Sequence, residues 1–306
     1  MKAQILCIAG PTASGKSARA VEEALKRGGE IISVDSRQVY RGLDVGTEKI
    51  SAEEMRGVPH HLIDIRDPQE KYSAGEFVAD ATRLIKEIGE RGKLPILVGG
   101  THFYFDALIH GLPMGTDPNL ELREKLEELS TEELHARVAF RDPRRAAELD
   151  PKNRHRLIRA LEIIEHLGSV PSRAPVAAPS ATRSNLVAEW IIIDPPREEL
   201  RARIDKRLEG AFARGLIDEV RRVRSVLAKP AKGGSPDASQ NEDAFRGDAR
   251  LDELGLEYRI VGEFLRGERS QASLLPALSA KLWQYARRQK AWLRKLYSQS
   301  IIPGAE

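Results

Sequence analysis

The segment GPTASGKS, from Gly10 to Ser17, constrains the fold of this chain more than any other feature. It follows the apolar, strand-like run Ala3–Ala9 and leads into a helical pattern over Ser17–Arg27. The glycines let backbone N–H groups turn inward around an anion, and the helix adds the positive end of its dipole. Lys16 would supply a charge to the phosphates and Ser17 a hydroxyl to Mg²⁺. The alternative is a glycine-rich turn without a ligand. The predicted phosphate-binding residues are Gly10, Pro11, Thr12, Ala13, Ser14, Gly15, Lys16 and Ser17.

Strand-like and helix-like segments alternate along the first hundred residues. Alternation with fully apolar strands is typical of a parallel sheet covered by helices on both faces. We therefore predict an α/β fold of the P-loop NTPase kind. Ligands of such sheets gather at the carboxyl ends of the strands, so Asp35–Ser36 and Gly99–Thr101 should join Gly10–Ser17 at one edge. The predicted strands are Ile5–Ile8, Ile31–Val34, His61–Ile65 and Leu94–Val98, and the predicted helices are Ser17–Arg27, Ser73–Arg91 and Thr101–Ile109.

The pattern changes after Gly111–Pro113. From Asn119 to Gly168 it is helical, charge-rich and without strand signals, and a connector rich in Pro, Ala and Ser follows at Val170–Ser184. Ala188–Asp194 then reads as another buried strand. We therefore predict a core of residues 1–115 and 186–306, split by a helical insertion domain at 116–185. Beyond that strand the sequence predicts helices at Glu198–Ala213, Leu216–Leu227, Leu251–Leu265 and Leu274–Tyr297, and a disordered loop from Lys229 to Asp248.

Composition narrows the class of protein. With 306 residues, 41% hydrophobic and 31% charged, the chain is typical of a globular protein with one large core or two modest ones. Neither a membrane span nor a signal peptide is visible. The single cysteine, Cys7, excludes an internal disulfide and is expected in the core. We expect a cytoplasmic protein, with a monomer as the default.

Basic residues cluster in two stretches, although the formal charge is only +3. Arg137–Arg159 holds eight basic and three acidic residues, and Lys281–Lys295 holds six basic residues and no acid. Such patches within a near-neutral chain indicate a polyanionic partner. Solvated helix faces are the alternative.

Three further segments carry functional groups. Asp35 ends the second predicted strand and is a metal ligand, a general base or a helix cap. Thr101 follows the glycines of Gly99–Gly100 and either caps a helix or bonds a phosphate oxygen. Gln284–Arg294 mixes bases with aromatics at helical spacing; Trp292 is expected in the core, and the arginines remain for phosphate or nucleic acid.

With these segments together, the sequence resembles the tRNA dimethylallyltransferases, which are similar to the adenylate isopentenyltransferases of the same superfamily. The matching blocks run from near residue 5 to near residue 294. They are GPTASGKS, DSRQVY (Asp35–Tyr40), VGTEK (Val45–Lys49), HHLID (His60–Asp64), YSAGEF (Tyr72–Phe77), PILVGGT (Pro95–Thr101), the helical stretch Asp150–Glu162 and YARRQKAWLR (Tyr285–Arg294).

The resemblance implies a reaction. A five-carbon group moves from dimethylallyl diphosphate to the exocyclic amino nitrogen of the adenine beside the anticodon, and the diphosphate leaves. Asp35 then serves as general base, Thr101 lies by the diphosphate, and Arg287 is a diphosphate partner. Lys16, together with Mg²⁺ on Ser17, would stabilise the leaving group.

The resemblance also implies contacts with the tRNA anticodon stem-loop. The adenine must be extruded from its stack to react, and the residues after Asp35 would hold it. The helical insertion resembles the family's domain that grips the anticodon stem. The implied tRNA contacts are Asp35, Ser36, Arg37, Gln38, Thr101, Arg123, Arg154, Arg156 and Arg159.

The sequence departs from the family pattern at three places. Glu48–Ile50 stands where the family usually has alanine-lysine-proline, and Thr101–Phe105 stands where it usually shows leucine-tyrosine soon after the glycine-glycine-threonine. Leu254–Arg259 replaces the usual block glycine-tyrosine-lysine-glutamate. Three alternatives therefore stay open. They are an isopentenyltransferase acting on a small adenine nucleotide, a kinase that binds ATP in the same loop with its acceptor at Asp35, and a nucleic-acid-binding protein that switches with nucleotide.

Overall fold

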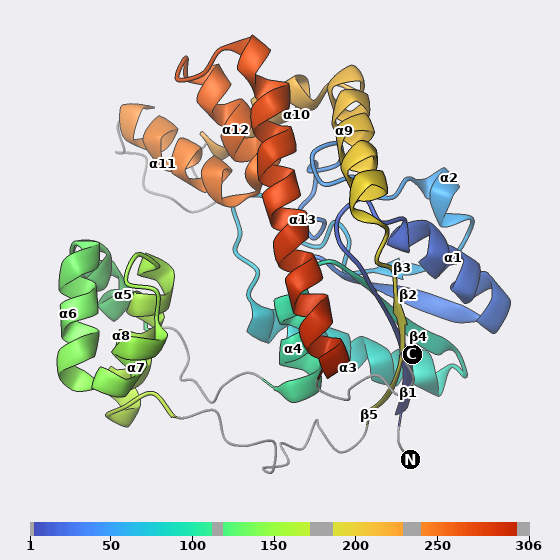
Figure 1. The fold of residues 1–306 in the computed structure, drawn as a ribbon, viewed down its shortest axis with the longest axis horizontal. Helices are drawn as coiled ribbons and strands as arrows, with labels where there is room; N and C mark the ends of the chain where they lie inside the picture. Colours follow the sequence, from blue (N-terminus) through green and yellow to red (C-terminus); the bar gives the residue numbers. More distant parts are fainter. Residues whose placement is uncertain (1–2, 112–118, 172–185, 229–239, 299–306) are drawn as a thin grey trace. The chain divides into compact units, whose positions relative to one another are not determined.

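The computed structural model describes residues 3–111, 119–171, 186–228 and 240–298. The chain divides into two compact units (Figure 1). The first, called the core unit, consists of Met1–Ile109 with Ser184–Glu306; the second, the helical unit, is His110–Arg183. The predicted domain boundaries, 116 and 185, lie outside the described residues.

A parallel sheet forms the centre of the core unit, as predicted. Among the described residues it has five strands in the order β3-β2-β4-β1-β5. β1 lies between β4 and β5, with Leu6 opposite Ile96 and Ala9 opposite Ile192. The strands are β1 (Ala3–Ala9), β2 (Gly29–Val34), β3 (His60–His61), β4 (Leu94–Gly99) and β5 (Leu186–Ile192).

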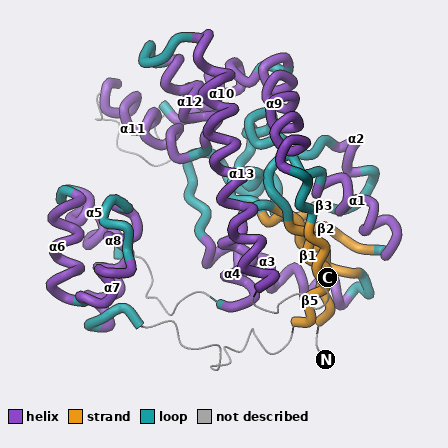
Figure 2. Tube along the Cα trace, viewed as in Figure 1, coloured by secondary structure: helices purple, strands orange, loops and turns teal. Residues whose placement is uncertain are grey.

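Side chains alternate between the two faces along each strand, and both faces of the central strands β2, β4 and β1 are buried. The predicted buried strand Ala188–Asp194 is the edge strand β5, none of whose residues is fully buried. On β1, Leu6 and Ile8 pack with helix α1 (Lys16–Arg27), whereas Ile5, Cys7 and Ala9 pack on the opposite face. Figure 2 shows helices on both sides of the strands. Cys7 is fully buried, which confirms its place in the core, and burial raises the pKa of its thiol. The helices over the second face include α3 (Ala74–Glu90) and α4 (His102–His110).

The third strand is shorter than predicted. Strand pairing with β2 covers only His60–His61, so the predicted extension to Ile65 is wrong. Leu62 and Asp64 have φ angles of 62° and 55°, in the left-handed region that a strand does not use. The chain therefore turns away from the sheet directly after His61.

Helices complete the core unit. The loop predicted through Asp248 is wrong from Gln240 onward, because α11 begins there; residues 229–239 lie outside the described residues. The single helix predicted over Leu251–Leu265 is two helices separated at Gly255, whose φ of 150° favours glycine. The helices are α2 (Ala52–Met55), α9 (Arg197–Ala213), α10 (Leu216–Leu227), α11 (Gln240–Glu253), α12 (Leu256–Leu265), a 3₁₀ turn (Gln271–Ser273) and α13 (Leu274–Ser298).

The described residues of the helical unit form helices only, as predicted. Capping side chains begin them, since Asn119, Ser130, Asp142 and Asn153 each accept a backbone N–H of the first turn. An apolar core that includes Leu157, Leu161 and Ile164 joins them. The helices are α5 (Leu120–Glu127), α6 (Thr131–Arg141), α7 (Pro143–Glu148) and α8 (Arg154–Leu167). Throughout the described ranges, no helix is long and apolar enough to cross a membrane.

Candidate active site

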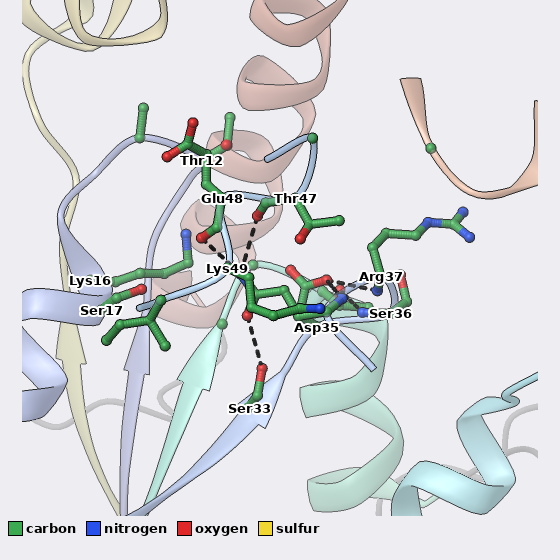
Figure 3. A pocket seen from close by; sticks show the side chains of 18 of the residues that line it. Thr12, Lys16, Ser17, Ser33, Asp35, Ser36, Arg37, Thr47, Glu48 and Lys49 are labelled. Carbon is green, nitrogen blue, oxygen red and sulfur yellow. Dashed lines mark hydrogen bonds between the residues drawn. The ribbon is translucent and has the colours of Figure 1, made fainter. Parts of the chain in front are cut away.

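A cavity of about 760 Å³ opens in the core unit at the carboxyl ends of β1, β2 and β4. It is lined by Thr12–Ser17, Asp35–Gln38 and Gly99–Thr101, three segments far apart in sequence. Figure 3 shows Lys16 and Ser17 on one side of it, with Asp35, Ser36 and Arg37 on the other. The predicted gathering of these residues at one edge of the sheet is confirmed.

The phosphate loop offers unpaired polar groups to this cavity. Gly15 has a φ of 88° and starts α1 without a side-chain cap, so the first N–H groups of the helix are open to a ligand. The hydroxyl of Ser14 is buried and has no hydrogen-bond partner in the described structure. Gly10 and Pro11, also predicted to bind phosphate, are not among the residues that line the cavity, and a Cβ at Gly10 would meet the Ser14 hydroxyl at 2.6 Å. The loop therefore has the features of an anion site.

Lys16 places a cationic amine beside this loop. Its Nζ donates to the carbonyl of Pro11 at 3.2 Å. Burial lowers the pKa of Lys16 to about 8; the charge of Asp35 opposes the shift, and that of Arg207 adds to it. Lys16 is therefore mostly protonated at neutral pH, and a negative charge bound beside it would raise its pKa.

Asp35 ends β2 and turns one carboxylate oxygen toward the backbone. Its Oδ1 accepts from the N–H of Arg37 at 2.7 Å and of Gln38 at 3.1 Å, so Asp35 caps a turn rather than a helix. The second oxygen, Oδ2, makes no hydrogen bond within the described residues. Thr101 Oγ1 accepts from the N–H of Ser36 at 3.1 Å, which ties the end of β4 to the end of β2. One carboxylate oxygen thus remains for a ligand.

Gln38 is held in a fixed orientation. Its Nε2 donates to the carbonyls of Thr47 and Glu48 at 3.1 and 3.2 Å, and its Oε1 accepts from Ser33 at 3.3 Å. The loop that supplies these carbonyls is itself bound by Glu219 of α10, a buried residue that sequence reasoning missed. Its carboxylate accepts the N–H groups of residues 44, 45 and 46 at 2.9, 2.7 and 2.9 Å, and the hydroxyl of Tyr258 at 2.7 Å.

Helix α13 joins two of the lining segments. Gln289 Oε1 accepts the N–H of Thr12 at 2.8 Å, and its Nε2 donates to the carbonyl of Gly100 at 2.9 Å. Tyr285 and Gln289, one turn apart, line the cavity, whereas Arg287 on another side of the helix is exposed and does not. The structure therefore brings the predicted block to the site but not its predicted arginine.

Arg207 also lines the cavity, next to the phosphate loop, and sequence reasoning missed it. It lies on α9, and its Nη1 donates to the hydroxyl of Thr12. Two carboxylates, Glu48 and Glu257, lie 3.7 Å from its nitrogens. No local motif surrounds Arg207 in the sequence.

The predicted tRNA contacts of the helical unit differ in their surroundings. Arg123 and Arg159 pair with the buried Glu162 at 2.8 and 3.1 Å. Arg154 pairs with Glu127 at 3.0 Å and donates to backbone carbonyls of the turn after α5. The contacts of Arg123 and Arg154 join α5 and the turn after it to α8, whereas the Arg159 pair lies within α8. Arg156 is exposed and forms no ion pair within the described residues.

The donor groups in the cavity fit Mg²⁺ held together with phosphates. No cluster of three His, Cys, Asp or Glu side chains occurs within the described ranges. Ser17, the predicted Mg²⁺ ligand, lines the cavity and carries a hydroxyl oxygen beside the phosphate loop. Mg²⁺ prefers oxygen ligands, keeps several waters and is usually bound by one or two protein groups with substrate phosphates. The residues present match that pattern.

Two proteins of known sequence illustrate what the chain is similar to. It is 40% identical over 297 residues to the tRNA dimethylallyltransferase of Thermomicrobium roseum, covering 95% of this chain and 84% of that protein. It is 41% identical over 296 residues to the tRNA dimethylallyltransferase of Anaeromyxobacter dehalogenans (strain 2CP-C), covering 95% of this chain and 92% of that protein.

Comparison with solved structures gives the same result as comparison with these sequences. The tRNA isopentenylpyrophosphate transferase of Bacillus halodurans is 38% identical with a TM-score of 0.63, over 96% of this chain and 87% of that one. A eukaryotic dimethylallyltransferase described as acting on tRNA is 26% identical with a TM-score of 0.72, over 95% of this chain and 69% of that one. The family model for IPP transferase matches residues 38–296. The chain therefore belongs to the IPP transferase family.

Proposed function

We propose that this enzyme transfers a dimethylallyl group from dimethylallyl diphosphate to the exocyclic amino nitrogen of the adenine 3′ of the anticodon in tRNA. The observation that carries the proposal is one cavity with an anion-binding loop on one side and the Asp35 carboxylate on the other. The relatives' names support the same prenyl chemistry and the same class of substrate.

Asp35 is the proton acceptor in this proposal. An aromatic amine is a weak nucleophile, and its nitrogen acquires positive charge as the new N–C bond forms. Transfer of the amino proton to the free Oδ2 of Asp35 removes that charge. The two N–H bonds to Oδ1 fix the carboxylate in place, so it need not reorient during the reaction.

The phosphate loop binds the leaving group. As the allylic C–O bond breaks, negative charge accumulates on the diphosphate, and N–H groups at the start of α1 with Lys16 and Arg207 stabilise it. Thr101 lines the same cavity, and its hydroxyl accepts the N–H of Ser36. Bound near Ser17, Mg²⁺ would neutralise part of the same charge. The reaction gives prenylated adenine and diphosphate, with the proton on Asp35.

tRNA binding extends the proposal to both units. In the core unit Ser36, Arg37 and Gln38 are proposed to hold the extruded adenine. In the helical unit Arg156 is the proposed phosphate contact, because it alone of the four predicted arginines has its charge uncompensated by a nearby acid in the described structure. The enzyme is proposed to act as a monomer, and a tRNA substrate supports a cytoplasmic location.

Labelled dimethylallyl diphosphate tests this function. The protein, Mg²⁺ and label are mixed separately with unmodified tRNA and with AMP, and ATP is tested with candidate acceptors. Label in tRNA is the expected result. Label in AMP alone assigns the chain to small-nucleotide prenylation, and ATP turnover without label transfer assigns it to the kinases.

A further inference from the structure

Arg207 lies where a diphosphate would be held. Its side chain is only 18% exposed, it donates to the hydroxyl of Thr12 in the phosphate loop, and its charge contributes to the lowered pKa of Lys16. A guanidinium in such a place is suited to bind phosphate oxygens.

Two carboxylates share this guanidinium. Glu48, from the loop after β2, approaches Nε at 3.7 Å, and Glu257 of α12 approaches Nη2 at 3.7 Å. Both distances are longer than a hydrogen bond, so the carboxylates balance the charge of Arg207 without fixing its donors. Glu48 also pairs with Arg214, and Glu257 is 13% exposed.

These carboxylates oppose a second anion. Diphosphate adds several negative charges to a partly desolvated cavity, where like charges repel more strongly than in water. Burial already raises the pKa of Glu257, and the charge of Arg207 opposes that rise. When diphosphate takes the donors of Arg207, Glu257 loses this partner and Glu48 keeps only Arg214, and both carboxylates face an anion.

We propose that Glu48 and Glu257 are positioning residues that act through Arg207 to weaken the hold of the cavity on diphosphate. They pair with Arg207 in the empty enzyme and compete for it with the product, so diphosphate leaves faster. The inference rests on the proposed function, which assigns diphosphate to this cavity.

Titration calorimetry with inorganic diphosphate and Mg²⁺ tests it. Glu257→Gln and Glu48→Gln should each bind diphosphate about three to five times more tightly than the wild type, the size expected for loss of one partly exposed charge pair. Damage to the fold would weaken binding, so the expected sign separates this role from a structural one. Glu22→Gln is the matched control, since Glu22 lines the same cavity without contacting Arg207.

A double-mutant cycle tests the route through Arg207. In an Arg207→Gln background, Glu257→Gln should change the affinity by a clearly smaller factor than in the wild-type background, because only the direct repulsion between the carboxylate and diphosphate is left. The inference is overturned for Glu257 if Glu257→Gln has the same effect on affinity in the Arg207→Gln background as in the wild type. It is overturned for either glutamate if its single variant binds diphosphate as weakly as the wild type or more weakly. In turnover assays the single variants should lower both the KM for the prenyl donor and kcat, because the product leaves more slowly. Wild-type protein that binds no diphosphate overturns the proposed function as well.

Discussion

Replacement of Glu219 by glutamine should destabilise the core unit severely. The carboxylate is 1% exposed and accepts four hydrogen bonds, from the N–H groups of residues 44–46 and from Tyr258. Glutamine keeps one acceptor oxygen and turns an NH₂ group toward the other donors. About two buried donors are then left unpaired, which costs about 1–3 kcal/mol each, and the remaining hydrogen bonds are made to a neutral oxygen instead of a charged one. We expect a loss of about 3–5 kcal/mol in the free energy of unfolding.

Urea unfolding followed by tryptophan fluorescence measures this loss in the right unit, because all three tryptophans, Trp190, Trp283 and Trp292, belong to the core unit. Tyr258→Phe removes one of the four donors and should cost only about 1–2 kcal/mol. Asp218→Asn is the control: its side chain is 66% exposed, and the change should stay within about 0.5 kcal/mol.

Amide hydrogen exchange adds a local test. The N–H groups of residues 44–46 should exchange faster in Glu219→Gln than in the wild type, since their acceptor is impaired. A loss below about 1 kcal/mol in Glu219→Gln, or a larger loss in Tyr258→Phe than in Glu219→Gln, would refute the view that this carboxylate anchors the loop.

Three further predictions concern activity and RNA binding. Asp35→Asn should lower prenyl transfer by about 10²-fold or more while diphosphate binding is retained; full activity would exclude Asp35 as the base. The affinity for the prenyl donor should fall as pH rises through about 8, because Lys16 loses its proton there. Lys16→Arg should remove that pH dependence. A wild-type Kd that does not change with pH would contradict the role of Lys16. Arg156→Ala should weaken tRNA binding and reduce its salt dependence without changing thermal stability. Arg154→Ala should lower the thermal stability of the helical unit. Equal effects of the two variants in both assays would contradict the assignment of Arg156 to RNA binding and of Arg154 to structure.

Local motifs allowed much of the site to be predicted. Residues of Gly10–Ser17, Asp35 and Thr101 line one cavity because each follows a strand of the same parallel sheet, and strand order does not alter the edge at which they end. The apolar runs likewise allowed four of the strands to be predicted. The interruption at Gly255 was missed because apolar periodicity continues across it.

Long-range partners could not be predicted. Arg207 and Glu219 contact loops more than 170 residues earlier in the chain, and nothing near them distinguishes them from other charged residues on amphipathic helices. The prediction for Arg287 is wrong for a different reason. A helix turns about 100° per residue, so Tyr285 and Gln289 lie on one face of α13 and Arg287 lies on another. Arg154 has an acidic partner 27 residues away, which spacing does not reveal.

The position of β1 between β4 and β5 has a consequence for synthesis on the ribosome. β5 begins 87 residues after β4 ends, and the helical unit is encoded between them. At about 5–20 residues per second, roughly 4–17 s pass before β1 can pair on its second side. During that interval an apolar strand has an open hydrogen-bonding edge, which is a template for pairing with another chain. The nascent protein therefore keeps one edge that is prone to aggregation for the whole time in which its helical unit is made.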